Sequence, residues 1–490
     1  MPNEPHERDR ESRQPHARPM GAAAASSDGP RDHRTRGSDS ARGVLRSSAG
    51  LGIVVVALIA VVLAITGVFA SPNRSPDSVA VAGATHAPSD APLEATPEPT
   101  GETANAQVSA PPPALESAPP AAASPSPSAA PVAPTAATVP AKKLQKAIND
   151  FRSKTGIPGL SVAVLWDDGR SWVGASGRAD IAAERPMTTD TGFAFASVSK
   201  TLTAAVVLQL VDEGKVDLDA PAAQYLPAYR LDKRITVRML LDHRSSLPDF
   251  FSNAKIDRAL QADKRATWTA ARTWKYVPKV RPKPGTIYDY SNTNYLLLGE
   301  LVEHVTSRPL ATEVRERLLD PLGLETAWYQ GVEEPKVKGA RGYRVYRTAS
   351  GSLAKAVAPR SDMMPFRSVV TAAGGAGSVA GTAMDAAKWM QAWGSGRVVS
   401  RAMFKEMLRD AKYTRAMHAI VTYGLGVQLI TISGQPTLGH SGRYLGFQNT
   451  VRYLRGPGIS IAILTNQNTY DPAVLMRKLV KIVAPVKPAG

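Results

Sequence analysis

The segment around Ser197 contains two residues whose types and spacing suit nucleophilic catalysis. Ser197 and Lys200 lie three positions apart in the apolar stretch 195–206, which predicts the start of a buried helix. Residues at i and i+3 share one helical face, with Cβ atoms about 5–6 Å apart. A serine hydroxyl needs a nearby base, and lysine serves as one when burial or a neighbouring cation lowers its pKa. Backbone N–H groups at the helix N-terminus would stabilise an oxyanion.

By itself, Ser-x-x-Lys is a weak signal in this chain. The same spacing occurs at Ser252/Lys255 and Ser352/Lys355, in stretches of polar and small residues. The alternative for any such match is a helix N-cap followed by an exposed lysine. Ser197 differs from the other two matches by its apolar surroundings and by two motifs further along the chain.

Tyr290 and Asn292 form the first of these motifs, in a loop that precedes an expected helix at 295–304. A tyrosine near a lysine ammonium is expected to have a lowered pKa and to shuttle protons. Asn292 can donate and accept hydrogen bonds with a substrate amide. The structural alternatives are a buried hydroxyl for Tyr290 and a helix N-cap for Asn292.

His440, Ser441 and Gly442 form the second motif, after a strand-like segment and before Arg443. A glycine at this point allows two backbone segments to approach closely, and a strand edge can supply an N–H to an oxyanion. The alternative is a surface turn with a solvated histidine.

Composition limits the possible functions. The chain has 490 residues, a net charge of +17 and no cysteine. Its basic residues are spread out rather than grouped with aromatic residues, which argues against nucleic-acid binding and suits a surface that faces an anionic envelope. The absence of cysteine excludes disulfides, thiolate metal sites and a lipid-modified cysteine anchor, and leaves the redox compartment open.

The composition of the first 141 residues does not favour a packed hydrophobic core. Residues 1–49 are polar and are expected to be a disordered cytoplasmic tail. Residues 50–70 are apolar and long enough to span a bilayer, with arginines mainly on the preceding side, which predicts an exported C-terminal part. The alternative is a signal peptide cleaved after Ala70, which would give a secreted protein. Residues 71–141 are rich in Ala, Pro and Ser and predict a linker of up to about 200 Å.

The globular part is expected at 142–490. Leu144, Ile148 and Phe151 predict an opening amphipathic helix, and 159–174 predicts a β-hairpin. Strand patterns return at 424–432, 447–453 and 459–464. A last helix follows Asp471-Pro472, with Val474, Leu475, Leu479 and Ile482 on its apolar face. The expected fold is α/β of the α+β type, with an antiparallel sheet flanked by the terminal helices and an inserted all-helical region at about 215–370.

The three motifs, in this order, resemble the signature elements of the class C β-lactamase and penicillin-binding protein family, over about 150–485. Class A β-lactamases would have Ser-Asp-Asn and Lys-Thr-Gly instead. The resemblance implies a serine β-lactamase/transpeptidase-like fold with no metal or cofactor. It also implies that Ser197 is the nucleophile, that Lys200 and Tyr290 form the base network, and that Asn292 orients the substrate. Residues 440–443 would bind the substrate, with the N–H groups of Ser197 and Arg443 as the oxyanion hole.

Two positions depart from the pattern of this family. Residues 243–247 read His-Arg-Ser-Ser-Leu where members often have His-Thr-Ser-Gly-Leu, which affects the expected conformation of that loop. His440 stands where a lysine often binds a substrate carboxylate, and an ordinary histidine is mostly neutral at pH 7. Inefficient hydrolysis of β-lactams is therefore expected.

The functional prediction is a membrane-anchored serine hydrolase, facing outward from a bacterial cell membrane and acting through an acyl-enzyme. Its substrate would be a cell-wall D-amino peptide, a β-lactam or an ester, as in the D-Ala-D-Ala carboxypeptidases and esterases of the family. The alternative is a catalytically inactive penicillin-binding-like protein that binds wall peptides or a protein partner. Retention of Ser197, Lys200, Tyr290 and Asn292 favours the enzyme.

Overall fold

The computed structural model describes residues 139–279, 283–348, 351–356, 364–409, 411 and 421–484. The expected tail, the apolar run at 50–70 and all but the last residues of the expected linker lie outside this set. Within the described ranges, no helix combines the length and the apolar character needed to cross a membrane.

An antiparallel sheet of eight strands organises the domain, with the strand order β3-β2-β1-β13-β12-β11-β10-β9. β1 pairs with both β2 and β13, so the first and last long strands lie side by side, with Leu160 opposite Thr465. The antiparallel pairing confirms the sequence-based prediction. The strands are β1 (Gly159–Leu165), β2 (Ser171–Asp180), β3 (Arg185–Pro186), β9 (Val421–Tyr423), β10 (Gln428–Ile432), β11 (Gln435–Tyr444), β12 (Phe447–Leu454) and β13 (Ile459–Thr465).

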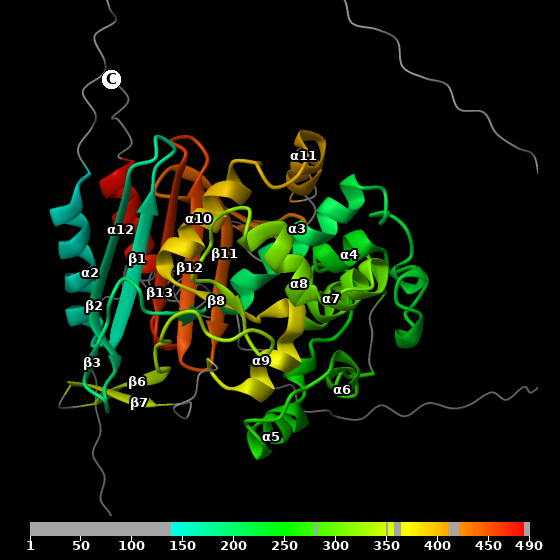
Figure 1. The fold of residues 1–490 in the computed structure, drawn as a ribbon, viewed down its shortest axis with the longest axis horizontal. Helices are drawn as coiled ribbons and strands as arrows, with labels where there is room; N and C mark the ends of the chain where they lie inside the picture. The colour runs from blue at the N-terminus through cyan, green and yellow to red at the C-terminus, as the bar shows by residue number, and fades with distance from the viewer. Residues whose placement is uncertain are drawn as a thin grey trace, which may run out of the picture. The chain divides into compact units, whose positions relative to one another are not determined.

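The two terminal helices cover one face of this sheet (Figure 1). Helix α2 (Ala141–Thr155) and helix α12 (Ala473–Val483) bury Leu144, Ile148, Leu475 and Leu479 against the strands. Their apolar residues recur every three to four positions, which is why this face could be read from the sequence. The expectation for Val474 is wrong, because its side chain is 55% exposed.

The opposite face of the sheet packs against α10 (Ala383–Gly394) and a helical region built around α3 (Ser199–Asp212). Eleven of the fourteen residues of α3 are buried, so this helix lies within the core rather than on the surface. The other helices of the region are α4 (Val237–Leu241), α5 (Ala254–Ala262), α6 (Ala270–Trp274), α7 (Asn292–Thr306), α8 (Leu310–Val314), α9 (Arg367–Ala373) and α11 (Arg401–Arg409).

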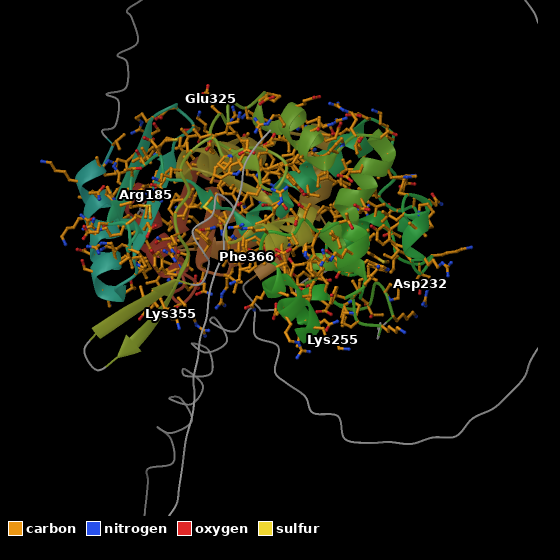
Figure 2. The ribbon with its side chains drawn as sticks, turned by 60° about the horizontal axis from the view of Figure 1, so that its bottom comes forward. Arg185, Asp232, Lys255, Glu325, Lys355 and Phe366 are labelled. Atoms are coloured by element: carbon orange, nitrogen blue, oxygen red, sulfur yellow. The ribbon has the colours of Figure 1, made fainter. Side chains whose placement is uncertain are left out.

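An all-helical region was expected at 215–370, but the structure also has strands there. β5 (Trp328–Tyr329) joins β4 (Phe193–Ala194) and β8 (Val379–Gly381) in a small sheet. β6 (Tyr343–Thr348) and β7 (Gly351–Ala356) form a separate hairpin, on which Figure 2 labels Lys355. Strands of two or three residues are too short to show a period of two, which is why β4, β5 and β8 could not be recognised.

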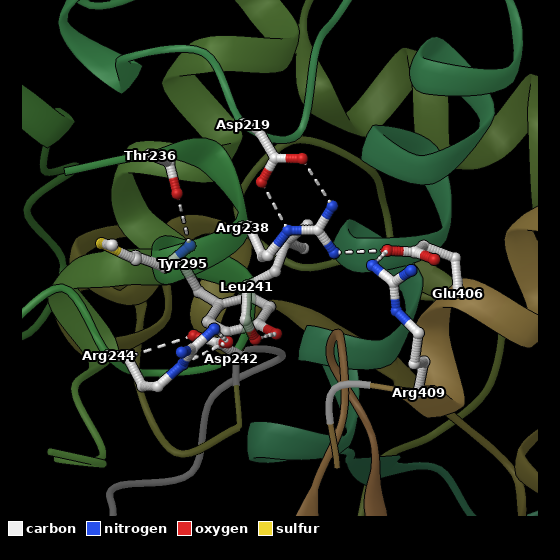
Figure 3. Close-up of polar contacts among 10 residues, drawn as sticks. Asp219, Thr236, Arg238, Leu241, Asp242, Arg244, Tyr295, Glu406 and Arg409 are labelled. Carbon is white, nitrogen blue, oxygen red and sulfur yellow. Dashed lines mark hydrogen bonds and ion pairs between the residues drawn. The ribbon is translucent and has the colours of Figure 1, made fainter. Parts of the chain in front are cut away.

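The first turn of α4 and the loop that follows the helix are held by ion pairs (Figure 3). Arg238 bridges Asp219 and Glu406, with nitrogen–oxygen distances of 2.7 Å to each. In the loop, Ser246 occupies the position of the family's glycine and has a φ of 58°. A serine therefore takes the left-handed conformation that glycine usually supplies.

Candidate active site

Ser197 lies in a 3₁₀ turn, Ala196–Val198, directly before α3. Ala196 has a φ of 52°, in a region that residues other than glycine seldom occupy and that is often found at functional sites. Ser197 is 8% exposed, so its hydroxyl lies just beneath the surface. The turn places Ser197 one helical turn before Lys200, as the sequence predicted.

Lys200 is fully buried, and its Nζ contacts three oxygen atoms. These are Ser197 Oγ at 3.1 Å, Asn292 Oδ1 at 2.7 Å and the Ala376 carbonyl at 2.8 Å. Asn292 Oδ1 and the carbonyl can only accept hydrogen bonds. A neutral amine would donate its two hydrogens to them, and its lone pair would then face the Ser197 hydroxyl. This is the geometry required of a base.

The electrostatics favour that neutral amine. Burial lowers the pKa of Lys200 to about 7, while the carboxylate of Asp249 raises it. Desolvation disfavours the charged form of any amine, and no neighbouring cation is needed to explain the direction of this shift. The expectation that burial would activate this lysine is thus supported by the structure.

Tyr290 lies beside both residues, with its ring centroid 5.1 Å from Lys200 Nζ. A hydrogen bond with Ser197 lowers the pKa of Tyr290, but burial raises it by more, so the net shift is upward. The expectation of a lowered pKa for Tyr290 is therefore wrong, because burial of the phenol outweighs the hydrogen bond with Ser197 and the carboxylate of Asp249 raises the pKa further. Tyr290 remains a neutral phenol that can donate or relay a proton.

Asn292 is the first residue of α7 and is bound at both ends of its amide. Oδ1 accepts from Lys200, and Nδ2 donates to Asp249 Oδ2 at 2.7 Å. The side chain therefore orients the lysine, with one amide hydrogen left for a substrate. The sequence analysis did not predict a role for Asp249 in this site, because an acidic residue after Pro248 has the pattern of a helix N-cap. Asp249 does also cap the turn at 250–252.

The third motif lies inside β11 rather than in a surface turn. His440 is fully buried, with Nε2 2.9 Å from the Tyr423 hydroxyl and Nδ1 2.6 Å from the Ser441 carbonyl. Since a carbonyl only accepts, Nδ1 carries the proton and Nε2 accepts from Tyr423. Burial, and next the positive charge of Lys200, lower the pKa of His440 to about 3. His440 is thus a neutral internal residue, and its expected part in substrate binding stays a prediction.

Gly442 brings β11 against the nucleophile turn. A Cβ atom on Gly442 would lie 2.2 Å from the Phe195 carbonyl oxygen, so only glycine allows this approach. β10 pairs with β11 only as far as Gly439, which leaves Ser441 to Arg443 on an open edge. The Ser441 N–H donates to Gln428 Oε1 on that edge, and alternate residues of a strand point the same way. The Arg443 N–H therefore also faces the open edge, where an oxyanion hole requires it.

A cavity of about 250 Å³ lies elsewhere in the domain, along α7. Glu300, Gly375 and Tyr329 are among its lining residues, whereas Ser197 and Lys200 are not. This cavity is therefore separate from the Ser197–Lys200 pair.

Comparison with known proteins agrees with this geometry. The Beta-lactamase family profile matches residues 144–484. The chain belongs to the Beta-lactamase family. It is 30% identical over 339 residues to penicillin-binding protein 4 of Amycolatopsis lactamdurans, a match that covers 66% of this chain and 84% of that protein. It is also 27% identical over 334 residues to a D-aminopeptidase of Brucella canis, over 68% of this chain and only 61% of that enzyme.

Solved structures show the same fold. The D-stereospecific amidohydrolase from a Streptomyces species aligns with a TM-score of 0.60 and 24% identity, covering 71% of this chain and 99% of that one. The D-amino acid amidase of Ochrobactrum anthropi SV3, complexed with L-phenylalanine amide, aligns with a TM-score of 0.59 and 27% identity. That alignment covers 70% of this chain and 97% of the amidase. The mixed sheet-and-helix architecture is therefore that of the serine β-lactamase/transpeptidase fold.

Proposed function

We propose that this Beta-lactamase family member hydrolyses amide or ester bonds next to a D-amino acid, through an acyl-enzyme on Ser197. The observation that carries the proposal is the buried Lys200 amine, 3.1 Å from the serine oxygen and with a pKa lowered by burial to about 7. The D-aminopeptidase and D-amino acid amidase relatives support an amide substrate. Penicillin-binding protein 4 supports a cell-wall peptide.

In the acylation step, Ser197 Oγ attacks the substrate carbonyl carbon while its proton moves to Lys200 Nζ. The carbonyl oxygen becomes an oxyanion that accepts from the N–H groups of Ser197 and Arg443. The carbon–nitrogen or carbon–oxygen bond then breaks. The leaving group takes a proton that passes from Lys200 through the Tyr290 hydroxyl, and an ester on Ser197 remains.

Deacylation uses the same groups in reverse. A water molecule gives a proton to Lys200, directly or through Tyr290, and its oxygen attacks the ester carbonyl. The oxyanion hole stabilises the second tetrahedral intermediate, and Ser197 Oγ regains a proton as the product acid leaves. Asn292 holds Lys200 throughout, because it accepts from Nζ and is itself anchored by Asp249.

A labelling experiment and a chiral substrate pair test this proposal. A fluorophosphonate or fluorescent penicillin should label the wild-type protein and leave Ser197→Ala unlabelled, as read by intact mass. The D-alanine p-nitroanilide should be cleaved at least ten times faster than the L-isomer. A protein that reacts with no probe and cleaves neither isomer would be the inactive binding protein instead.

We also propose, from the sequence alone, that residues 50–70 anchor the chain with its catalytic domain outside the cytoplasm. Fractionation and N-terminal sequencing of the protein made by its native host test this point. Retention of residues 50–70 in the membrane fraction is expected. A mature protein beginning at Ser71 would mean cleavage and secretion.

A further inference from the structure

The loop at 243–247, where the sequence departs from the pattern of the family, lies against the Tyr290–Asn292 motif. The Asp289 N–H, directly before the motif, donates to the His243 carbonyl at 2.8 Å. The side chain of His243 is fully buried. Its imidazole therefore contacts the motif from inside the protein.

The imidazole of His243 accepts a hydrogen bond at Nδ1. The donor is the N–H of Ser291, the middle residue of the motif, at 3.2 Å. A backbone N–H only donates, so Nδ1 carries no proton and the neutral ring holds its proton on Nε2. Burial lowers the pKa of His243 well below its ordinary value, and the charge of Lys200 is the next cause. The imidazole is therefore neutral at pH 7, and its Nδ1 remains an acceptor.

Asn294 makes a second hydrogen bond to the same nitrogen. Its Nδ2 lies 3.3 Å from His243 Nδ1 and donates to it, because Nδ1 is unprotonated. Ser245 fixes this orientation of the amide, since its hydroxyl donates to Asn294 Oδ1 at 2.6 Å. Ser291 is the N-cap residue of α7 and Asn294 lies in its first turn, so one ring nitrogen holds the start of the helix at two points.

The ring of His243 also packs against the side chain of Tyr290. The two ring centroids are 4.3 Å apart, and the ring planes are inclined at 35°. Tyr290 in turn hydrogen-bonds with Ser197. His243 thus contacts the motif twice, through the backbone of Ser291 and through the aromatic ring of Tyr290.

We propose that His243 is a positioning residue for the Tyr290–Asn292 motif. By holding the backbone of Ser291, it keeps the Tyr290 hydroxyl within reach of the nucleophile. The same contact keeps the amide of Asn292 on the lysine base. His243 does not itself exchange a proton with the substrate, because its Nδ1 is occupied and its ring is fully buried. This inference rests on the proposed acyl-transfer function.

Two variants of the full-length protein separate this role from a merely structural one. His243→Leu removes the acceptor. In His243→Asn the side-chain oxygen can take the place of Nδ1, and asparagine tolerates the left-handed backbone of this residue, whose φ is 61°. The measurements are kcat for D-alanine p-nitroanilide and for p-nitrophenyl acetate, together with the thermal unfolding midpoint.

For His243→Leu, we expect kcat to fall at least tenfold on the ester and at least thirtyfold on the amide. The amide should lose more because its leaving group needs the proton that Tyr290 relays. A change in the folded fraction alone would lower both rates equally and leave their ratio unchanged. His243→Asn should recover at least a third of the wild-type kcat on both substrates.

Ser246→Gly is the matched control in the same loop. Its hydroxyl donates to the Lys283 carbonyl at 3.0 Å, outside the motif, and glycine suits the φ of 58° at this position. Both kcat values should stay within twofold of the wild type. If Ser246→Gly lowered the amide-to-ester ratio as His243→Leu does, the loop as a whole would be responsible, and the assignment to His243 would be wrong.

An unchanged amide-to-ester ratio in a folded His243→Leu would overturn the inference, as would a His243→Asn that is equally impaired. If His243→Leu does not fold, His243→Gln replaces it, because the amide of glutamine lies near the position of Nε2 and not of Nδ1. If the wild type cleaves only the ester, the loss in His243→Leu and the recovery in His243→Asn on that substrate decide. A wild type that cleaves neither substrate and takes no label on Ser197 would contradict the proposed function itself.

Discussion

The Nζ atom of Lys200 lies 3.1 Å from Ser197 Oγ, and the same atom donates to Asn292 Oδ1 and to the Ala376 carbonyl. The two acceptors fix the direction of the amine, so the contact with Ser197 is the one through which a proton can be received. The protein thereby combines two requirements for a lysine base, a low pKa and a fixed orientation.

The first prediction concerns the pH dependence of this base. Because the pKa of Lys200 is lowered to about 7, kcat/KM for an uncharged p-nitrophenyl ester should rise with pH through that value. Below it Nζ is an ammonium with no lone pair for the serine proton, and above it the amine is neutral. Initial rates between pH 5 and 9 give the profile. A profile that stays flat across this range would exclude Lys200 as the base.

Lys200→Arg provides the companion measurement. Arginine remains charged at every accessible pH and cannot accept the serine proton. The variant should lose about 10²–10⁴-fold in kcat, the usual contribution of a general base. Retention of more than a tenth of the wild-type rate in a folded variant would contradict the assignment.

The second prediction concerns Asp249, whose carboxylate raises the pKa of Lys200. Asp249→Asn keeps an oxygen that can accept from Asn292 Nδ2 but removes the negative charge. The ammonium form of Lys200 then loses stabilisation, so the pH at which activity is half-maximal should move to lower values. The same ester profile measures this shift. A shift to higher pH would show that the carboxylate does not act on the lysine as the structure indicates.

The residues of this site could be predicted from the sequence only where they belong to a motif. Ser197, Lys200, Tyr290 and Gly442 occur in motifs with fixed spacing, and each has the position that the motif implies. Asp249 could not be found, since no spacing relates it to the motifs, and it reaches the site only through the packing of a loop.

The helices and strands likewise divide into those that a sequence pattern predicts and those that it does not. The strands β12 and β13 and the helices α2 and α12 were predicted because long apolar patterns define them. The hairpin β6–β7 was missed, because its strands lie in a region dominated by helices. The burial of His440 could not be predicted, because a residue type gives no indication of its burial. Burial lowers the pKa of its imidazole and keeps it neutral, as expected at pH 7, and its role in substrate binding stays a prediction.

The third prediction tests Tyr290 as a proton relay. Tyr290→Phe retains the ring beside Lys200 and removes only the hydroxyl that hydrogen-bonds with Ser197. We expect kcat for an amide substrate to fall about 10²–10⁴-fold, with a smaller loss on a p-nitrophenyl ester, whose leaving group needs no proton. Tyr288→Phe on the same loop is the matched control and should affect the two substrates equally. Equal losses for amide and ester in Tyr290→Phe would rule out protonation of the leaving group by this residue.

The fourth prediction concerns stability in acid and depends on His440. Its pKa is about 3 in the folded protein, whereas an unfolded histidine titrates near its ordinary value of about 6.5. Between these values the unfolded chain binds a proton that the folded chain does not, so the free energy of unfolding falls as the pH falls. His440→Gln removes this titration and keeps an oxygen that can accept from the Tyr423 hydroxyl. From pH 7 to pH 4 the wild type should lose about 3 kcal/mol more than this variant.

Urea unfolding at the two pH values measures this difference in stability. His304→Gln is the matched control, because His304 is exposed on α7 and its replacement should leave the acid sensitivity of the wild type unchanged. An equal loss of stability in wild type and His440→Gln would mean that the buried imidazole accepts a proton without unfolding. The neutral state that we assign to His440 would then be wrong.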